Sequence, residues 1–244
     1  METYAQIKQS LKKLRLSALS TTIEQRTQEA IEHQLSYHDY LLLLLQDEID
    51  ARGHKKKELL IKKAKFGRFK HLSEFDFTVL PELNKQKILG FTSGQFIENT
   101  ENIIFEGNTG TGKTFLAKAL AYEMCCKNYK VLFTRTAKML EDIYAGKADA
   151  TYAKRMAAYI NPDLLVLDDW GLTEFSNQFL TILNEIISER CENGSIIITS
   201  NRAIKNWDEL FNEPVISSAL LDRIFHNSHL IKMEGKSYRR RLNL

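Results

Sequence analysis

Apolar residues recur at helical spacing along the first 75 residues of the chain. They form two series, Leu11, Leu14, Ala18, Leu19 and Leu41, Leu42, Leu45, Ile49. Ser36 precedes the second series and is followed three residues later by Asp39, a pattern typical of a helix start. Residues 1–75 are therefore predicted to form a small all-helical domain. Residues 72–80 are expected to be a connector, and Pro81 is expected in the first turn of a further helix.

From about residue 100 the pattern changes to short β-rich runs that alternate with helical stretches. The expected strands are Asn102–Glu106, Val131–Thr134, Leu164–Leu167, Ser195–Thr199 and His229–Lys232. Nearly continuous apolar runs of this kind are typical of strands that are buried on both faces of a sheet. Residues 76–244 are therefore predicted to form an α/β domain, a parallel sheet sandwiched by helices.

The segment after the first expected strand satisfies the phosphate-loop pattern G-x-x-x-x-G-K-[ST]. It consists of Gly107, Asn108, Thr109, Gly110, Thr111, Gly112, Lys113 and Thr114, and the expected nucleotide site also includes Phe115. The glycines allow backbone N–H groups to converge on phosphate oxygens, and the following helix N-terminus favours an anion. Lys113 is expected to reach the β- and γ-phosphates, and the Thr114 hydroxyl is expected to ligate Mg²⁺. The segment thus predicts a P-loop nucleoside triphosphatase.

Two other expected strands end in polar residues, at the edge where open α/β sheets bind ligands. Asp168 and Asp169 follow one strand, and Asn201 follows another. Asp168 is the candidate for Mg²⁺ coordination through water, and Asp169 is the candidate to polarise the attacking water. Asn201 is expected to hold the same water or a γ-phosphate oxygen. Asp and Asn also favour turns at strand ends, so these roles depend on the phosphate loop.

Positive charge is concentrated in one segment of the chain. The net charge is only +3, but residues 51–71 contain nine basic residues and one acid. This asymmetry predicts a polyanion-binding surface, with a solvated lysine-rich helix face as the alternative. The residues expected to contact the polyanion, which the resemblance described below implies is DNA, are Lys55, Lys56, Lys57, Lys62, Lys63, Lys65, Arg68 and Lys70. Phe66 and Phe69 lie among them and are expected to anchor the segment to the body of the protein, with stacking on bases as the alternative.

Composition argues against several classes of protein. The apolar stretch Leu41–Leu45 is far shorter than the roughly 20 residues of a membrane span, and the N-terminus lacks a secretory pattern. The three cysteines are not spaced as in a zinc site and do not suggest a disulfide framework. We therefore expect a cytoplasmic protein without a membrane partner.

Beyond these motifs, the chain resembles the IstB/DnaC-like branch of the AAA+ ATPases. The residues that carry the resemblance are the phosphate loop, Asp168-Asp169-Trp170-Gly171, Thr199-Ser200-Asn201, Leu221-Asp222-Arg223 and Gly235-Lys236-Ser237-Tyr238-Arg239. The similarity to IstB-type transposition helpers covers nearly the whole chain. It includes residues 45–52, the lysine-rich run and Phe75-Asp76-Phe77.

The resemblance implies an ATPase that uses ATP and Mg²⁺ and assembles into a homo-oligomer on double-stranded target DNA. Such a helper deforms the DNA and recruits and stimulates a cognate IstA-like transposase, while hydrolysis controls assembly and release. ATP would lie at subunit interfaces, with Arg223 as the arginine finger and Arg239 as a second γ-phosphate sensor. Asp169 stands where many AAA+ enzymes have Glu, and its shorter arm implies slower hydrolysis or a bridging water. The few residues after Lys232 imply little or no C-terminal lid.

Two alternatives remain open at this point. A DnaC-like loader of a replicative helicase would share the ATPase core but would bind a helicase through the N-terminal segment and would prefer single-stranded DNA. A P-loop adaptor would bind nucleotide as a structural switch without hydrolysing it. Turnover that DNA stimulates and that Asp169→Asn abolishes would exclude the adaptor.

Overall fold

The computed structural model describes residues 2–69, 71–172 and 174–235. The chain divides into two compact units, Met1–Leu59 and Leu60–Leu244. The domain boundary predicted from the sequence, 75/76, lies within the second of these units.

The first unit is helical, as expected. It contains α1 (Glu2–Lys13), α2 (Ser17–Glu32) and most of α3 (Tyr37–Ala64). The predicted start of α3 is confirmed, because Ser36 Oγ accepts a hydrogen bond of 3.1 Å from the backbone N–H of Asp39. The buried apolar cluster of this unit is small and consists of Leu19, Ile23 and Leu44.

The second unit is built on a five-stranded sheet with the order β2-β3-β4-β1-β5. The strands are β1 (Asn102–Gly107), β2 (Val131–Arg135), β3 (Leu164–Trp170), β4 (Ser195–Ser200) and β5 (Ser228–Met233). Every neighbouring pair is parallel, so the predicted strands and their direction are confirmed. All six residues of β4 are buried, as expected for a strand covered on both faces.

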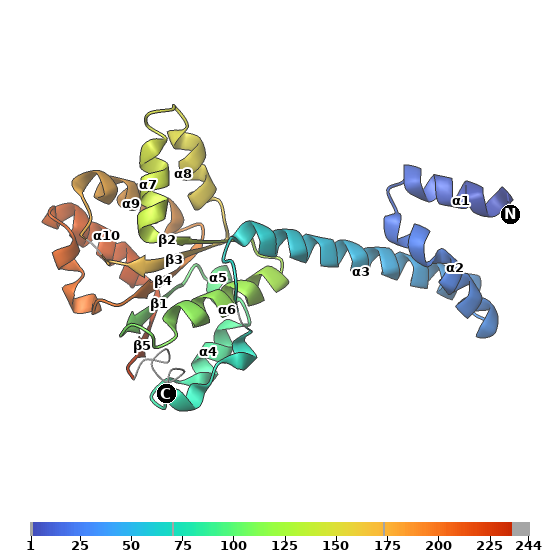
Figure 1. The fold of residues 1–244 in the computed structure, drawn as a ribbon, viewed down its shortest axis with the longest axis horizontal. Coiled ribbons are helices and arrows are strands. Elements are labelled where there is room, and N and C mark those ends of the chain that lie inside the picture. The colour runs from blue at the N-terminus through green and yellow to red at the C-terminus, as the bar shows by residue number, and fades with distance from the viewer. Residues whose placement is uncertain (1, 70, 173, 236–244) are drawn as a thin grey trace. The chain divides into compact units, whose positions relative to one another are not determined.

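Helices cover both faces of this sheet (Figure 1). The helices are α4 (Lys85–Phe91), α5 (Gln95–Glu98), α6 (Lys113–Cys126), α7 (Thr136–Ala145), α8 (Tyr152–Ile160), α9 (Asn177–Arg190) and α10 (Pro214–His226). Ile103 and Phe105 of β1 pack in one apolar cluster with α6, whereas Ile104 packs in a second cluster with α7, α9 and α10. Because strand side chains alternate, the two clusters are the two faces of one sheet.

The segment between α3 and α4 packs against the α6 side of the core. Phe66 is 3% exposed, and the ring of Phe69 stacks on Tyr122 at a centroid distance of 4.4 Å, so the anchoring role of both phenylalanines is confirmed. Two short 3₁₀ helices follow, Leu72–Glu74 and Phe77–Val79. Two further 3₁₀ helices, Ile204–Asn206 and Asp208–Leu210, lie between β4 and α10.

The prediction for Pro81 is wrong. Helix α4 begins at Lys85, because Asn84 Oδ1 accepts the N–H of Lys87 at 3.0 Å and caps the helix there. Pro81 lies in the turn before this cap. In the part of the chain that the structure describes, no helix has the length and apolar character to cross a membrane.

Candidate functional site

The phosphate loop joins the end of β1 to the start of α6, at the carboxyl edge of the sheet. A Cβ at Gly107 would lie 2.2 Å from the carbonyl oxygen of Met233 in β5. Gly112 has φ +98°, and a Cβ there would lie 2.7 Å from Cε2 of Phe75. Only glycine is compatible with these close approaches and with that backbone conformation. The loop is therefore walled by β5 on one side and by the Phe75 segment on the other.

Lys113, the first residue of α6, is buried inside the loop. Its side chain is closed over the loop backbone, where Nζ donates to the carbonyl oxygens of Gly107 at 2.7 Å and Asn108 at 2.8 Å. This arrangement holds an ammonium group at the N-terminus of a 14-residue helix, where the helix dipole also favours an anion.

Asp168 joins three elements of the site through hydrogen bonds. Its Oδ1 accepts from Thr114 Oγ1 at 2.8 Å and from Thr199 Oγ1 at 2.5 Å. Its backbone oxygen accepts from Thr136 Oγ1 at 3.1 Å. Asp168 is 5% exposed, and its two hydroxyl donors are the buried Thr199, 1% exposed, and the half-buried Thr114. The structure thus brings the two predicted metal residues, Thr114 and Asp168, into direct contact.

Asp169 lies in an irregular stretch of β3. The β3–β4 register shifts between Leu167 and Trp170, and Asp169 has φ +59°, which is uncommon for a residue with a side chain. Its backbone N–H donates to Thr199 Oγ1 at 3.1 Å. Its Oδ2 lies 3.6 Å from Nε of Arg135 at the end of β2. The bulge therefore turns the side chain of Asp169 out of the regular alternation of the strand and places it beside the guanidinium of Arg135.

Asn201 lies at the same edge of the sheet because of the strand order. It follows β4 directly, β4 lies between β3 and β1, and Ser200 is level with Trp170 of β3. Asn201 is half-buried. The predicted sensor, the two acids and the phosphate loop are thus on one edge, although they come from separate parts of the sequence.

Phe115 follows the phosphate loop in α6 and is half-buried. Its ring lies 5.3 Å from that of Phe75 and packs against the α6-side core. No role in the site was predicted for Phe75, which lies next to Gly112. The pattern that could have indicated one is the pair of aromatic residues, Phe75 and Phe77, in an otherwise polar connector. Arg135 and Thr199 were likewise given no role.

The residues at this edge fit a triphosphate with Mg²⁺. The loop is shaped so that a side chain at Gly107 or Gly112 would fill it, and it ends at the buried ammonium of Lys113. The Thr114 hydroxyl and the Asp168 carboxylate are hard oxygen donors of the kind that Mg²⁺ prefers. Among the described residues, no cluster of three or more His, Cys, Asp or Glu forms a metal cage. Such a cage is not required, because Mg²⁺ usually takes one or two protein oxygens together with substrate phosphates.

Comparison with known proteins places this site in a family. The profile described as IstB-like ATP binding protein matches residues 9–244. The chain belongs to the IstB-like ATP-binding family. The family predicted from the sequence is thereby confirmed.

Relatives of this IstB-like chain are ATP-binding proteins of insertion sequences. One, from Mycobacterium tuberculosis, is 34% identical over 96% of this chain and 94% of its own length. The ATP-binding protein of insertion sequence IS21 from Pseudomonas aeruginosa is 29% identical over 94% of this chain and 86% of its own length. The similarity therefore spans both units of the fold.

Solved structures share the fold of the IstB-like chain at low sequence identity. DnaI matches with a TM-score of 0.59 and 22% identity, over 69% of this chain and 93% of the other. The DnaC helicase loader matches with a TM-score of 0.51 and 20% identity, over 72% of this chain and 98% of the other. DnaA bound to AMPPCP and single-stranded DNA matches with a TM-score of 0.56 and 21% identity, over 68% of this chain and 50% of the other. The predicted P-loop AAA+ fold is confirmed.

Arg223 lies on α10 and is directed toward α9. Its Nη1 donates to Asn184 Oδ1 at 3.1 Å and to the carbonyl oxygen of Ala219 at 3.5 Å. The half-buried guanidinium is thus held by neutral oxygens and takes no part in the hydrogen bonds of the phosphate loop described above. Arg239, the other arginine expected to sense nucleotide, lies outside the described residues.

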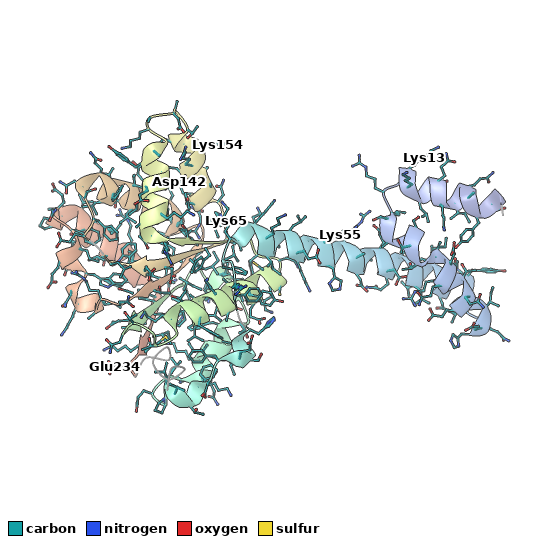
Figure 2. All side chains as sticks on the ribbon, viewed as in Figure 1. Lys13, Lys55, Lys65, Asp142, Lys154 and Glu234 are labelled. Atoms are coloured by element: carbon teal, nitrogen blue, oxygen red, sulfur yellow. The ribbon has the colours of Figure 1, made fainter. Side chains whose placement is uncertain are left out.

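The basic residues assigned to DNA contact are divided between the two compact units. Lys55, Lys56 and Lys57 belong to the first unit, and Lys62, Lys63, Lys65 and Arg68 belong to the second. All are exposed except the half-buried Lys57, and Lys55 Nζ contacts Ser17 Oγ at 3.3 Å. Figure 2 labels Lys55 and Lys65 along α3 and just beyond its end. Lys70 lies outside the described residues.

Proposed function

We propose that this IstB-like protein hydrolyses ATP with Mg²⁺ and assembles as a homo-oligomer on double-stranded target DNA, which it deforms. We further propose that it recruits and stimulates the transposase of its insertion sequence, with hydrolysis controlling assembly and release. The observation that carries the ATPase proposal is the hydrogen-bonded set of Thr114, Asp168 and Thr199 beside the phosphate loop. The insertion-sequence names of its relatives support the role in transposition.

The residues of the chain divide the work of hydrolysis. The loop N–H groups and Lys113 bind the phosphates, while Thr114 and Asp168 hold Mg²⁺, which when bound neutralises charge on the phosphate oxygens. Asp169 accepts a hydrogen bond from the attacking water and orients it, and Asn201 holds that water or a γ-phosphate oxygen. Arg135, 3.6 Å from Asp169, limits the directions in which that carboxylate points.

Removing the charge of Asp169 tests the hydrolytic step. Asp169→Asn is expected to lower phosphate release by about 100-fold or more while leaving the affinity for a fluorescent ATP unchanged. Asp50→Asn, an exposed site on α3, is the matched control. Equal turnover of the Asp169 variant and the unaltered protein would contradict the role assigned to Asp169. If the unaltered protein itself shows no turnover, the result would favour the alternative of a P-loop adaptor that does not hydrolyse ATP.

The N-terminal unit supports the proposal of self-association. Among the described residues of this unit only a small apolar cluster is buried, whereas Leu41, Leu42, Leu45 and Ile49 along α3 are 53%, 63%, 44% and 62% exposed. Apolar faces of this kind mark protein contact surfaces. Light scattering with a non-cleavable ATP analogue and a long duplex is expected to show oligomers that are lost in Leu45→Glu/Ile49→Glu. A protein that stays monomeric under these conditions would refute the assembly.

Arg223 is proposed to act on the nucleotide of a neighbouring copy. Arg223→Ala and Lys113→Ala are each expected to lose turnover, since one lacks the finger and the other lacks phosphate binding. A mixture of the two is expected to regain activity, because the Arg223 variant binds ATP and the Lys113 variant supplies Arg223 to it. No recovery in mixtures that co-assemble would place Arg223 outside the shared site.

The basic segment is proposed to contact DNA phosphates. Lys56→Glu/Lys57→Glu/Lys62→Glu/Lys63→Glu is expected to weaken duplex binding and to flatten its salt dependence. The control carries Lys12→Glu/Lys13→Glu/Lys127→Glu/Lys205→Glu, which changes the net charge equally. Binding is compared with ATP, ADP and no nucleotide, and equal affinity in all three states would contradict the coupling to ATP. Preference for single-stranded DNA would favour the helicase-loader alternative.

Recruitment of the transposase is tested with the cognate IstA-like transposase. Co-sedimentation on duplex DNA is expected with ATP and is expected to be lost in Lys113→Ala. If co-sedimentation is unchanged in Lys113→Ala, transposase binding does not require bound nucleotide, which would contradict the coupling.

A further inference from the structure

A groove runs along the outer edge of β2, away from the phosphate loop. It has a volume of about 930 Å³ and is lined by the whole of β2, by α7 and α8, and by the start of the second unit at Leu60, Lys63 and Lys65. Strand β2 is the first strand of the sheet order and pairs only with β3 among the described strands. Its other edge therefore faces the groove.

The backbone of β2 presents hydrogen-bonding groups to this groove. The carbonyl oxygen of Lys130 accepts from the N–H of Leu164, which directs the backbone of residue 130 toward β3. Because backbone direction alternates along a strand, residues 132 and 134 also face β3. The N–H groups of Val131, Phe133 and Arg135 and the C=O groups of Val131 and Phe133 consequently point outward, whereas the C=O of Arg135 accepts from Thr134 Oγ1 at 3.2 Å. An edge of this kind is a template for pairing with a further extended chain.

The rim of the groove is strongly basic. Its lysines are Lys63, Lys65, Lys130, Lys138 and Lys154, and none of them forms a salt bridge with another residue of the described ranges. Figure 2 labels Lys65 near the end of α3 and Lys154 on α8. Among the described residues that line the groove, the only acid is Asp142 of α7. The groove therefore carries a large excess of unpaired positive charge.

Asp142 does not offset this charge, because its oxygens already have partners. Arg155 Nη1 donates to Asp142 Oδ1 at 2.9 Å, and the Tyr159 hydroxyl donates to Asp142 Oδ2 at 2.9 Å. Burial, and after it the bond to Asp142, raise the pKa of Tyr159, so its hydroxyl remains a donor. Asp142 of α7 thus pairs with side chains of α8 and helps to hold the two helices together.

The floor between the lysines is apolar. Leu132 of β2, Ala157 and Ala158 of α8, and Pro162 line it, and Phe133 lines the groove from the opposite face of the sheet. An extended peptide places alternate side chains on opposite faces, so it can bury apolar side chains on this floor while its acidic side chains reach the rim.

We propose that this groove is a docking site for an acidic, extended peptide segment of a partner protein, which adds a sixth strand to the sheet at β2. The proposal goes beyond the ATPase and DNA-binding functions proposed above. The outward backbone groups and the apolar floor favour a peptide over a nucleic acid, because a sugar-phosphate chain has no amide edge to match those of residues 131, 133 and 135. The charge of the rim selects the acidic character of the peptide.

The experiment uses the full-length protein and a fluorescein-labelled peptide of alternating glutamate and valine, about nine residues long to span the five-residue strand with overhang at both ends. Controls are the same peptide with its central valine replaced by proline, a lysine–valine peptide, and a labelled oligothymidine of matched length. Anisotropy gives the affinities, and amide hydrogen exchange gives the place of binding. Expected are micromolar binding of the acidic peptide, at least about 10-fold weaker binding of the proline peptide, and slower exchange at Val131, Phe133 and Arg135.

Two protein variants test whether lysines at the rim of the groove bind the acidic peptide. Lys138→Glu/Lys154→Glu is expected to weaken the acidic peptide by at least about 10-fold while duplex binding and ATP binding stay unchanged, because neither lysine belongs to the residues assigned to DNA or nucleotide. Lys127→Glu/Lys205→Glu is the matched control and is expected to bind the peptide normally. Equal binding of the proline and unmodified peptides, no protection of the β2 amides, or protection by oligothymidine and not by peptide would each overturn the proposal.

Discussion

The hydroxyl of Thr114, at the start of α6, donates a hydrogen bond of 2.8 Å to the carboxylate of Asp168, near the end of β3. This bond ties the helix that follows the phosphate loop to the strand that carries the acids. The two oxygens are therefore presented together to any cation that accompanies a bound triphosphate.

Replacing Thr114 tests this relationship. Thr114→Ala is expected to lose most of the increase in ATP affinity that Mg²⁺ produces, by about 10-fold, because one of the two oxygen donors is gone. Thr114→Ser keeps the hydroxyl and is expected to behave like the unaltered protein. The measurement is a titration of fluorescent ATP with and without Mg²⁺, and an unchanged Mg²⁺ effect in Thr114→Ala would remove Thr114 from the metal site.

Thr199 is predicted to stabilise the folded protein through its two hydrogen bonds at the carboxyl edge of the sheet. It donates to Asp168 and accepts from the N–H of Asp169, so Thr199→Val leaves a buried carboxylate with one donor fewer and leaves that N–H without its acceptor. The expected loss is about 1–3 kcal/mol in the free energy of unfolding. Urea denaturation measures it. Thr199→Ser is expected to retain most of the stability, and an equal loss in both variants would mean that packing of the methyl group dominates.

Replacing two glycines with alanine is predicted to change the stability of the protein in opposite directions. Gly112 has φ +98° and lies against Phe75, so Gly112→Ala is expected to cost about 1–3 kcal/mol and to weaken ATP binding. Gly53 is in the middle of α3 with no atom within 4 Å of an added Cβ, so Gly53→Ala is expected to stabilise the protein by roughly 0.5–1 kcal/mol. Thermal unfolding followed by circular dichroism measures both, and a stabilised Gly112→Ala would contradict the tight wall at the loop.

The N-terminal unit is predicted to lose stability in acid through Glu48. Glu48 Oε2 accepts from the N–H groups of Ala18 and Leu19, and Oε1 accepts from Arg52. Burial raises the pKa of Glu48, but the bonds from Arg52 and from the two N–H groups together outweigh burial, and the pKa lies below its ordinary value of 4.5. A lowered pKa means that the stabilisation is present above the ordinary pKa and is lost as the pH falls through the lowered one.

Urea unfolding of the full-length protein at neutral pH and below about pH 4 tests this prediction. Glu48→Gln is expected to be less stable at neutral pH and to lose less on acidification than the unaltered protein. Glu32→Gln, an exposed site at the end of α2, is the control. Parallel acid sensitivity of the Glu48 variant and the unaltered protein would assign the effect to other carboxylates.

The strands and the phosphate loop could be predicted because their signals are local. A run such as Leu164–Leu167 is apolar without interruption, and the loop from Gly107 to Thr114 is contiguous, so a few neighbouring residues carry the information. The start of α3 was predicted for the same reason, from Ser36 and Asp39. Pro81 was misread because proline fits both a turn and a first helical residue, and the cap at Asn84 decided between them.

The sequence by itself determined that a parallel α/β sheet would present a triphosphate loop, two acids and an asparagine at one edge, since strand pattern and motif are encoded over short stretches. Only the tertiary structure decided which strands are neighbours. The position of β4 between β3 and β1 lets Thr199 contact Asp168, the end of β2 brings Arg135 to Asp169, and the unpaired side of β2 becomes a basic groove. These relationships depend on crossover connections and on packing between residues that lie far apart in the chain, which no local pattern specifies.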